Sequence, residues 1–157
     1  LNKLELSQND RRLLAQLYAR RGVPERAAIE ISQLNGANSD VQLLSEQATY
    51  WQLAKEWDTA LDVWKLAAKL DAKYQWNVAQ LMVQQGYYQP ALKALERVKG
   101  RKVDVALAKT RAFYKLDDLD KALIEAKRAN NAAPSKQARS WIKYLTQLRQ
   151  AKQQTAG

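Results

Sequence analysis

Three aspartates close together, Asp117, Asp118 and Asp120, are the first candidates for chemistry, because clustered carboxylates can hold a divalent cation. A calcium loop also needs a glycine turn and a distal bidentate glutamate, and this segment has neither. Carboxylates at the start of a helix instead cap its free N–H groups and interact favourably with its dipole. We therefore interpret the cluster as a solvated, helix-capping turn and predict no metal site.

The chain has no cysteine and no histidine among its 157 residues. Thiolate nucleophiles, imidazole acid–base catalysis and zinc sites with cysteine or histidine ligands are therefore excluded. The sequence also lacks a phosphate-cradling glycine loop and a nucleophile elbow. We predict a protein that is not an enzyme and that uses no cofactor.

Charge and composition point to a helical protein with a basic C-terminal part. Residues 1–99 have 13 basic and 11 acidic side chains, whereas residues 100–157 have 13 basic and 5 acidic ones. This asymmetry favours acidic partners at the C-terminal end. With 46% hydrophobic residues, five glycines and three prolines, the composition favours long helices. No apolar run approaches the ~18 residues needed to span a membrane.

Small residues recur in pairs, and the two members of each pair are always 12 positions apart. The pairs are Ala15 with Ala27, Ala48 with Ala60, Ala79 with Ala91, and Thr110 with Ala122. The second members of successive pairs are 33, 31 and 31 residues apart. A constant spacing within a unit, with variation only between units, indicates a repeated helical hairpin whose two helices approach closely at the small residues.

These hairpins resemble the tetratricopeptide repeat, with its L-G-x-x-Y and A-x-x-x-F pattern, over about residues 8–134. The first unit, for example, has Leu14-Ala15-x-x-Tyr18 followed by Ala27-x-x-x-Ile31. The usual early tryptophan is replaced by Arg11, Leu44, Gln75 and Ala106 in the four units, and a closing proline occurs only at Pro134. The resemblance, to bacterial members of the family, implies an all-α right-handed superhelix of about four hairpins. A Sel1-like or irregular hairpin array is the structural alternative.

The chain is predicted to form a single repeat domain over residues 1–157. The repeats are expected at about 8–38, 41–71, 72–101 and 103–133. A further helix at about 135–153 has Trp141, Leu145 and Leu148 on one face, as expected of a helix that caps the last hairpin. Leu1, Leu4 and Leu6 resemble the end of an earlier repeat, so we interpret the chain as part of a longer array.

The tetratricopeptide resemblance also implies a concave groove lined by the first helix of each repeat, where a peptide segment binds. Residues spaced i, i+4 on those helices share a face. The predicted partner-binding residues are Arg12, Gln16, Arg20, Thr49, Trp76, Gln80, Gln84, Arg111 and Lys115. For Trp76 two interpretations stay open: an aromatic anchor in the groove, or a side chain shielded by a neighbouring helix.

The leading functional hypothesis is a scaffold that binds a segment of a partner protein in this groove, with the basic C-terminal part favouring an acidic partner. Nucleic acid or an anionic polysaccharide bound by the basic C-terminal surface is the alternative. The basic residues considered for it are Arg101, Lys102, Lys109, Arg111, Lys127, Arg128, Arg139 and Lys143. Nucleic acid is disfavoured because no base-reading pair recurs in every repeat. The Ala- and Gln-rich repeats resemble those of bacterial envelope proteins, including accessory proteins of polysaccharide export and of TonB-type energy transduction. A periplasmic or envelope location is therefore favoured over the cytoplasm.

Overall fold

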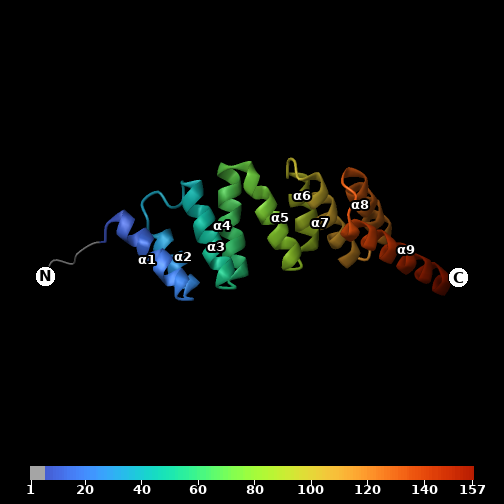
Figure 1. Ribbon diagram of the computed structural model, residues 1–157, viewed down its shortest axis with the longest axis horizontal. Helices are drawn as coiled ribbons and strands as arrows, with labels where there is room; N and C mark the ends of the chain where they lie inside the picture. The colour runs from blue at the N-terminus through green and yellow to red at the C-terminus, as the bar shows by residue number, and fades with distance from the viewer. Residues whose placement is uncertain (1–5) are drawn as a thin grey trace. The chain divides into compact units, whose positions relative to one another are not determined.

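The computed structural model describes residues 6–157, and within this range it contains α-helices and one short 3-10 helix but no strand (Figure 1). The prediction of an all-α fold is confirmed. The helices are α1 (Gln8–Arg20), α2 (Pro24–Ser32), α3 (Val41–Leu53), α4 (Trp57–Leu70), η1 (Ala72–Tyr74), α5 (Gln75–Gln84), α6 (Tyr88–Glu96), α7 (Lys102–Lys115), α8 (Leu119–Ala132) and α9 (Lys136–Ala156). Leu1 and Leu4 lie outside the described residues, and Leu6 is exposed.

The small residues of the repeat are the most deeply buried positions of the helices. All eight of them have an exposed fraction of 0%: Ala15, Ala27, Ala48, Ala60, Ala79, Ala91, Thr110 and Ala122. In α2, α4, α6 and α8 the small residue is always the fourth residue of the helix. Thr110 fits because its hydroxyl donates a hydrogen bond of 2.8 Å to the carbonyl oxygen of Ala106, which satisfies the one polar group.

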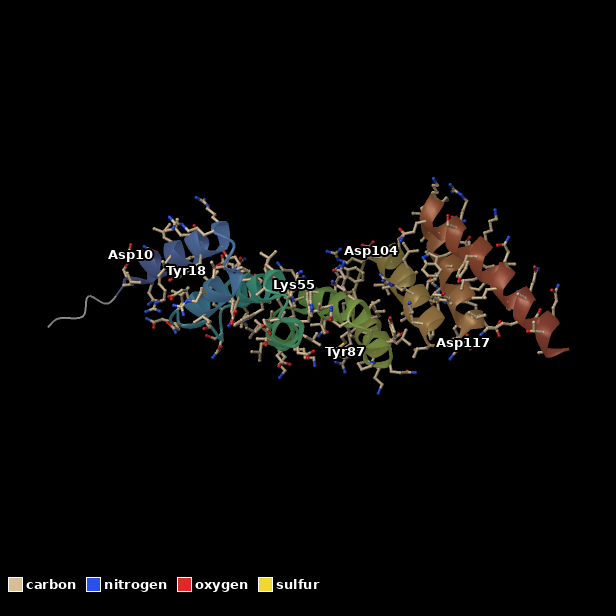
Figure 2. The ribbon with its side chains drawn as sticks, turned by 90° about the horizontal axis from the view of Figure 1, so that it is seen from below. Asp10, Tyr18, Lys55, Tyr87, Asp104 and Asp117 are labelled. Atoms are coloured by element: carbon tan, nitrogen blue, oxygen red, sulfur yellow. The ribbon has the colours of Figure 1, made fainter. Side chains whose placement is uncertain are left out.

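The turn inside each hairpin has the same backbone geometry in all four cases. A residue with positive φ follows the first small residue by seven positions, at Gly22, Lys55, Gly86 and Asp117. The next residue donates its N–H to a carbonyl five positions earlier, as from Val23 to Tyr18 at 2.9 Å. Each first helix therefore ends in a Schellman motif, although two of the four left-handed residues, Lys55 and Asp117, are not glycine (Figure 2).

The chain divides into two compact units, of which the first extends to Val78. In this unit α1 packs on α2, α2 on α3 and α3 on α4. Its core includes Ala15, Ala27, Ile31, Leu34 and Leu43, with Tyr18, Ala19 and Tyr50 packed against them. Asp40 caps α3 by accepting hydrogen bonds from the N–H groups of Gln42 and Leu43.

The tryptophans of the second hairpin fill space inside the first unit. Trp64 is 5% exposed, stacks on Tyr74 with 5.7 Å between ring centroids, and donates its indole N–H to Gln52. Trp51 and Trp57 are half-buried. Aromatic side chains of this size supply much of the apolar surface that a small unit buries.

The second unit begins at Ala79, within α5, and includes α6 to α9. Here α6 packs on α7, α7 on α8 and α8 on α9. Its larger core cluster consists of Leu119, Ala122, Leu123, Ala126 and Leu145, and it is covered by side chains that include Trp141 and Leu148. The apolar face predicted for the last helix therefore does pack on the fourth hairpin, and α9 extends three residues beyond the expected end. The bounds of the repeats and their union in one domain stay predictions.

Candidate functional site

The predicted groove residues of α1 are all exposed: Arg12, Gln16 and Arg20. Arg12 forms an ion pair with Glu46 of α3, so the first helices of two successive hairpins contact each other on this face. The side chains of the pair are 44% and 31% exposed. Such a pair contributes little stability, but it offsets one positive charge and orients the Arg12 side chain toward α3.

Tyr50 belongs to the same face, although it is not among the predicted residues. It lies on α3 one helical turn after Glu46 and packs against the core of the first unit. Burial raises the pKa of the Tyr50 phenol above its usual value, and Glu46 raises it further, while Arg12 lowers it. The phenol therefore stays protonated at neutral pH and offers a hydrogen-bond donor beside the Arg12–Glu46 pair.

Thr49 and Leu53 present a second row of side chains on α3, spaced i, i+4. Thr49 is exposed, and its hydroxyl donates a hydrogen bond of 2.7 Å to the carbonyl oxygen of Ser45. The hydroxyl oxygen can therefore act toward a ligand only as an acceptor. Leu53 is 62% exposed and is the most exposed of the large apolar side chains on the described helices. The row thus combines an acceptor with an apolar contact point.

Trp76, near the start of α5, is half-buried, which is intermediate between the two interpretations that the sequence left open. Part of its ring surface faces solvent, and part is covered by protein. A half-buried tryptophan is held in place by its own packing and so binds a ligand at low entropic cost.

The remaining predicted residues lie in the second unit. Gln80 and Gln84 are exposed on α5, and Arg111 and Lys115 are exposed on α7. The Lys115 ammonium group lies 5.8 Å from the centroid of the Tyr114 ring, within the range of a cation–π contact. Of the nine predicted residues, the five from Arg12 to Trp76 thus belong to the first unit and four to the second. That all nine line one groove stays a prediction.

An aromatic cluster beside Lys115 was not predicted from the sequence. The rings of Tyr114, Trp141 and Tyr144 make edge contacts, with 5.5 Å between the centroids of Tyr114 and Trp141. The two tyrosine hydroxyls are 3.0 Å apart, and this hydrogen bond raises the pKa of the Tyr144 phenol above its usual value. Tyr144 is 46% exposed. The i, i+3 spacing of Trp141 and Tyr144 was the available signal, but only the α7–α9 contact brings Tyr114 to them.

The aspartate turn is a set of caps and ion pairs. Asp118 accepts a hydrogen bond of 3.2 Å from the N–H of Lys121 and so caps α8, as predicted. The Asp120 carboxylate lies 3.3 Å from the guanidinium group of Arg149, and the Asp117 carboxylate pairs with the ammonium group of Lys152. Arg149 and Lys152 both belong to α9. The side chains of Asp120 and Asp117 are 78% and 73% exposed, so the turn is solvated as predicted, and its carboxylates also form ion pairs. Throughout residues 6–157 no group of acidic side chains could hold a metal ion.

The basic C-terminal surface has fewer unpaired cations than the charge count suggests. Lys109 lies 2.8 Å from Glu96 and is 13% exposed, Arg128 lies 2.8 Å from Glu125, and Arg101 lies 3.5 Å from Asp104. Three of the eight cations considered for polyanion binding are therefore neutralised locally. The exposed remainder consists of Lys102, Arg111, Lys127, Arg139 and Lys143.

Comparison with known proteins identifies the fold. No family model matches the chain, and no curated protein does. Solved structures of MamA share its architecture. MamA from residue 41 to its end, from Desulfovibrio magneticus RS-1, is 17% identical, with a TM-score of 0.75 over 98% of this chain and 91% of that one. MamA of strain MSR-1 is 18% identical, with a TM-score of 0.71 over 94% and 89%. At these identities the likeness shows an all-helical, tetratricopeptide-like fold.

The fold shared with MamA does not identify partner-binding residues in this chain. The candidate surface is therefore assigned from the exposure and chemistry of its side chains. Its members are polar, cationic or aromatic side chains of first helices, and Leu53 and Tyr50 join them from the structure. No described helix is both long enough and apolar enough to cross a membrane.

Proposed function

We propose that this chain is a tetratricopeptide-type scaffold that binds a segment of a partner protein through exposed side chains of its first helices, α1, α3, α5 and α7. One observation supports this most: eight of the nine predicted residues are exposed and Trp76 is half-buried, whereas the small residues of the same helices are fully buried. The first helices thus pack through their small residues and leave most of the predicted binding residues exposed.

The chemistry of that face suits an extended protein segment with acidic groups. The glutamine amides of Gln80 and Gln84 can pair with backbone N–H and C=O groups, because each amide has both donors and an acceptor. Arg111 and Lys115 supply positive charge for carboxylates. Trp76 and Leu53 supply the apolar contacts that usually contribute most to the affinity of an interface.

Affinity capture with the intact protein, followed by measurement of binding to the purified partner, tests this function. Trp76→Ala and Arg111→Glu should each weaken binding by about tenfold or more, as is usual for a central anchor of an interface. Lys127→Glu is the matched control, because Lys127 is an exposed cation on a second helix, α8, and the charge change is the same. Equal binding by the wild type, Trp76→Ala and Arg111→Glu would contradict the proposal.

Polyanion binding is the second candidate, favoured by the exposed cations of the second unit. It predicts that Lys127→Glu weakens binding as much as Arg111→Glu does, and that affinity falls steeply with salt. A titration against a nucleic acid and an anionic polysaccharide at two salt concentrations distinguishes it from a protein partner. An envelope location is a separate hypothesis, which a full-length sequence without signal peptide or membrane anchor would exclude.

A further inference from the structure

A cavity of about 560 Å³ lies within the second unit, between α6, α7 and α8. None of the nine predicted groove residues lines it. Its polar lining comes from Glu96, Lys102, Lys109, Glu125 and Arg128, and Ala106 forms part of its apolar wall. The cavity is therefore a separate feature from the first-helix face, with charged groups of both signs at its surface.

Glu125 is a buried group of this cavity with only one of its two carboxylate oxygens hydrogen-bonded. The residue is 7% exposed, and its Oε1 atom accepts a hydrogen bond of 2.8 Å from Arg128. The other carboxylate oxygen, Oε2, is buried and has no hydrogen-bond partner among the described residues. A buried carboxylate oxygen without a donor costs free energy, so it has a strong affinity for any donor that can reach it.

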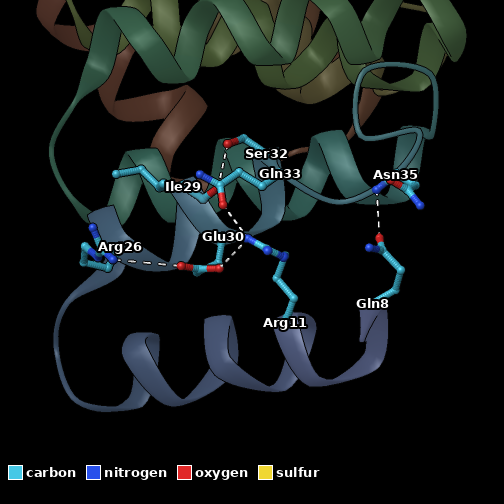
Figure 3. A network of polar contacts seen from close by, with 8 residues as sticks. All are labelled: Gln8, Arg11, Arg26, Ile29, Glu30, Ser32, Gln33 and Asn35. Carbon is cyan, nitrogen blue, oxygen red and sulfur yellow. Dashed lines mark hydrogen bonds and ion pairs between the residues drawn. The ribbon is translucent and has the colours of Figure 1, made fainter. Parts of the chain in front are cut away.

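In the first unit, the residue equivalent to Glu125 is Glu30, and its carboxylate is contacted by arginine side chains. Glu30 follows Ala27 by three positions, as Glu125 follows Ala122, and it too is 7% exposed. There, the guanidinium group of Arg11 donates to Glu30 Oε2 at 3.1 Å, and Arg26 lies 3.9 Å from Oε1 (Figure 3). Glu30 thus has a cation at each oxygen.

The second unit has the carboxylate but lacks this arginine. Arg11 precedes the small residue Ala15 by four positions, and the residue four positions before Thr110 is Ala106, which is 2% exposed. An alanine methyl group cannot reach Glu125, so the space that Arg11 occupies in the first unit corresponds to part of the cavity here. The second and third repeats have neither charge, because Val63 and Ala94 replace the glutamate and Leu44 and Gln75 replace the arginine.

We propose that this cavity, the Glu125 pocket, binds the guanidinium group of an arginine side chain supplied by a partner protein. Glu125 Oε2 accepts its hydrogen bonds, as Glu30 Oε2 does from Arg11. Two of the three cations that line the cavity are already paired, Lys109 with Glu96 and Arg128 with Glu125 Oε1, and the third, Lys102, is exposed to solvent. Guanidinium is favoured over ammonium because it is the more weakly hydrated cation, and because the Arg11 guanidinium group, through Nη1, is what Glu30 and Gln33 both contact in the first unit. The site goes beyond the groove function, which uses other residues.

The test uses the whole chain and a small probe, N-acetylarginine amide, titrated while backbone amide signals are followed by NMR. Saturable shifts should centre on Ala106 and Glu125. N-acetylcitrulline amide, which has the same shape but no charge, should bind roughly tenfold more weakly or worse, because hydrogen bonds between charged groups are about twice as strong as neutral ones. Glu125→Gln should lower the affinity for the arginine probe by a similar factor, while the matched change Asp120→Asn, at a carboxylate that does not line the cavity, should leave it unchanged.

Ala106→Arg supplies the missing side chain from within the chain. It should raise the thermal midpoint and abolish the saturable shifts, because the new guanidinium group occupies the pocket. The absence of saturable shifts would show a cavity filled by water only and would overturn the proposal. Equal shifts with the arginine and citrulline probes, or undiminished binding by Glu125→Gln, would show binding that does not depend on the Glu125 carboxylate and would overturn it as well. Glu125→Gln decides the matter even where Ala106→Arg does not fold. Loss of the groove function leaves these results unaffected.

Discussion

The left-handed residues of the hairpin turns allow a direct measurement of backbone strain. Gly22 has φ +77°, and a Cβ atom added there would meet no heavy atom within 4 Å. Gly22→Ala therefore changes the backbone preference without a steric clash. An L-residue in the left-handed region costs about 1–2 kcal/mol, while alanine lowers the entropy of the unfolded chain and returns about 0.4–1 kcal/mol. We expect a net destabilisation of about 1 kcal/mol.

Lys55 is the matched position, because it has φ +60° in the same turn of the second hairpin. Lys55→Gly removes the cost of a left-handed L-residue from the folded state, but glycine also raises the entropy of the unfolded chain. The difference between these two effects is a stabilisation of up to about 1 kcal/mol. The Schellman hydrogen bond from Glu56 to Trp51, 2.9 Å long, should be unaffected.

Urea unfolding, followed by far-ultraviolet circular dichroism, measures both changes as shifts in the free energy of unfolding. Opposite signs for Gly22→Ala and Lys55→Gly are the expected result. If Gly22→Ala were neutral, or if Lys55→Gly destabilised the protein, the left-handed residue would not set the cost of these turns.

Three further predictions concern the second unit. Leu145→Ala should lower the free energy of unfolding by about 2–5 kcal/mol in urea titrations, because Leu145 lies on α9 and is fully buried against α8. A loss below about 1 kcal/mol would contradict the role of α9 as a cap. The hydrogen bond and the charge of Lys109 lower the pKa of the Glu96 carboxyl, so the pair stabilises the fold above the unfolded pKa and loses its effect as pH falls through the folded one. Lys109→Met should therefore raise the Glu96 pKa in an NMR pH titration, and an unchanged value would disprove the contact. Since Tyr114 raises the pKa of the Tyr144 phenol, Tyr114→Phe should lower it toward its usual value in an ultraviolet pH titration, whereas an unchanged value would mean that the hydroxyl pair does not form.

The fold could be predicted because its determinant is local and repeated. Two small residues 12 positions apart define a hairpin, and Gly22 with Pro24 defines where its helices end and begin. The packing of α9 followed likewise from Trp141 and Leu145 on one face. These signals need no knowledge of distant contacts, since helix periodicity alone places the residues on a face.

The details of the candidate surface could not be predicted in the same way. Arg12 and Glu46 are 34 positions apart, and Tyr114 and Tyr144 are 30 apart, so neither contact has a local signature. The exposure of the groove residues followed from helix geometry. Which of them are already paired, such as Arg12, depends on side chains that meet only when helices pack.

Packing also explains why the turn residues vary while the turn itself does not. Ala48 and Ala60 are both fully buried, and α3 packs directly on α4, so the two helices are held in one register. Only Ala54, Lys55 and Glu56 remain between α3 and α4, and a reversal this short requires a left-handed residue. The strain at Lys55 is then offset by burial on both sides of the turn. Side-chain packing thus fixes the backbone of each hairpin, which leaves positions such as those of Arg11 and Ala106 free to differ in chemistry between repeats.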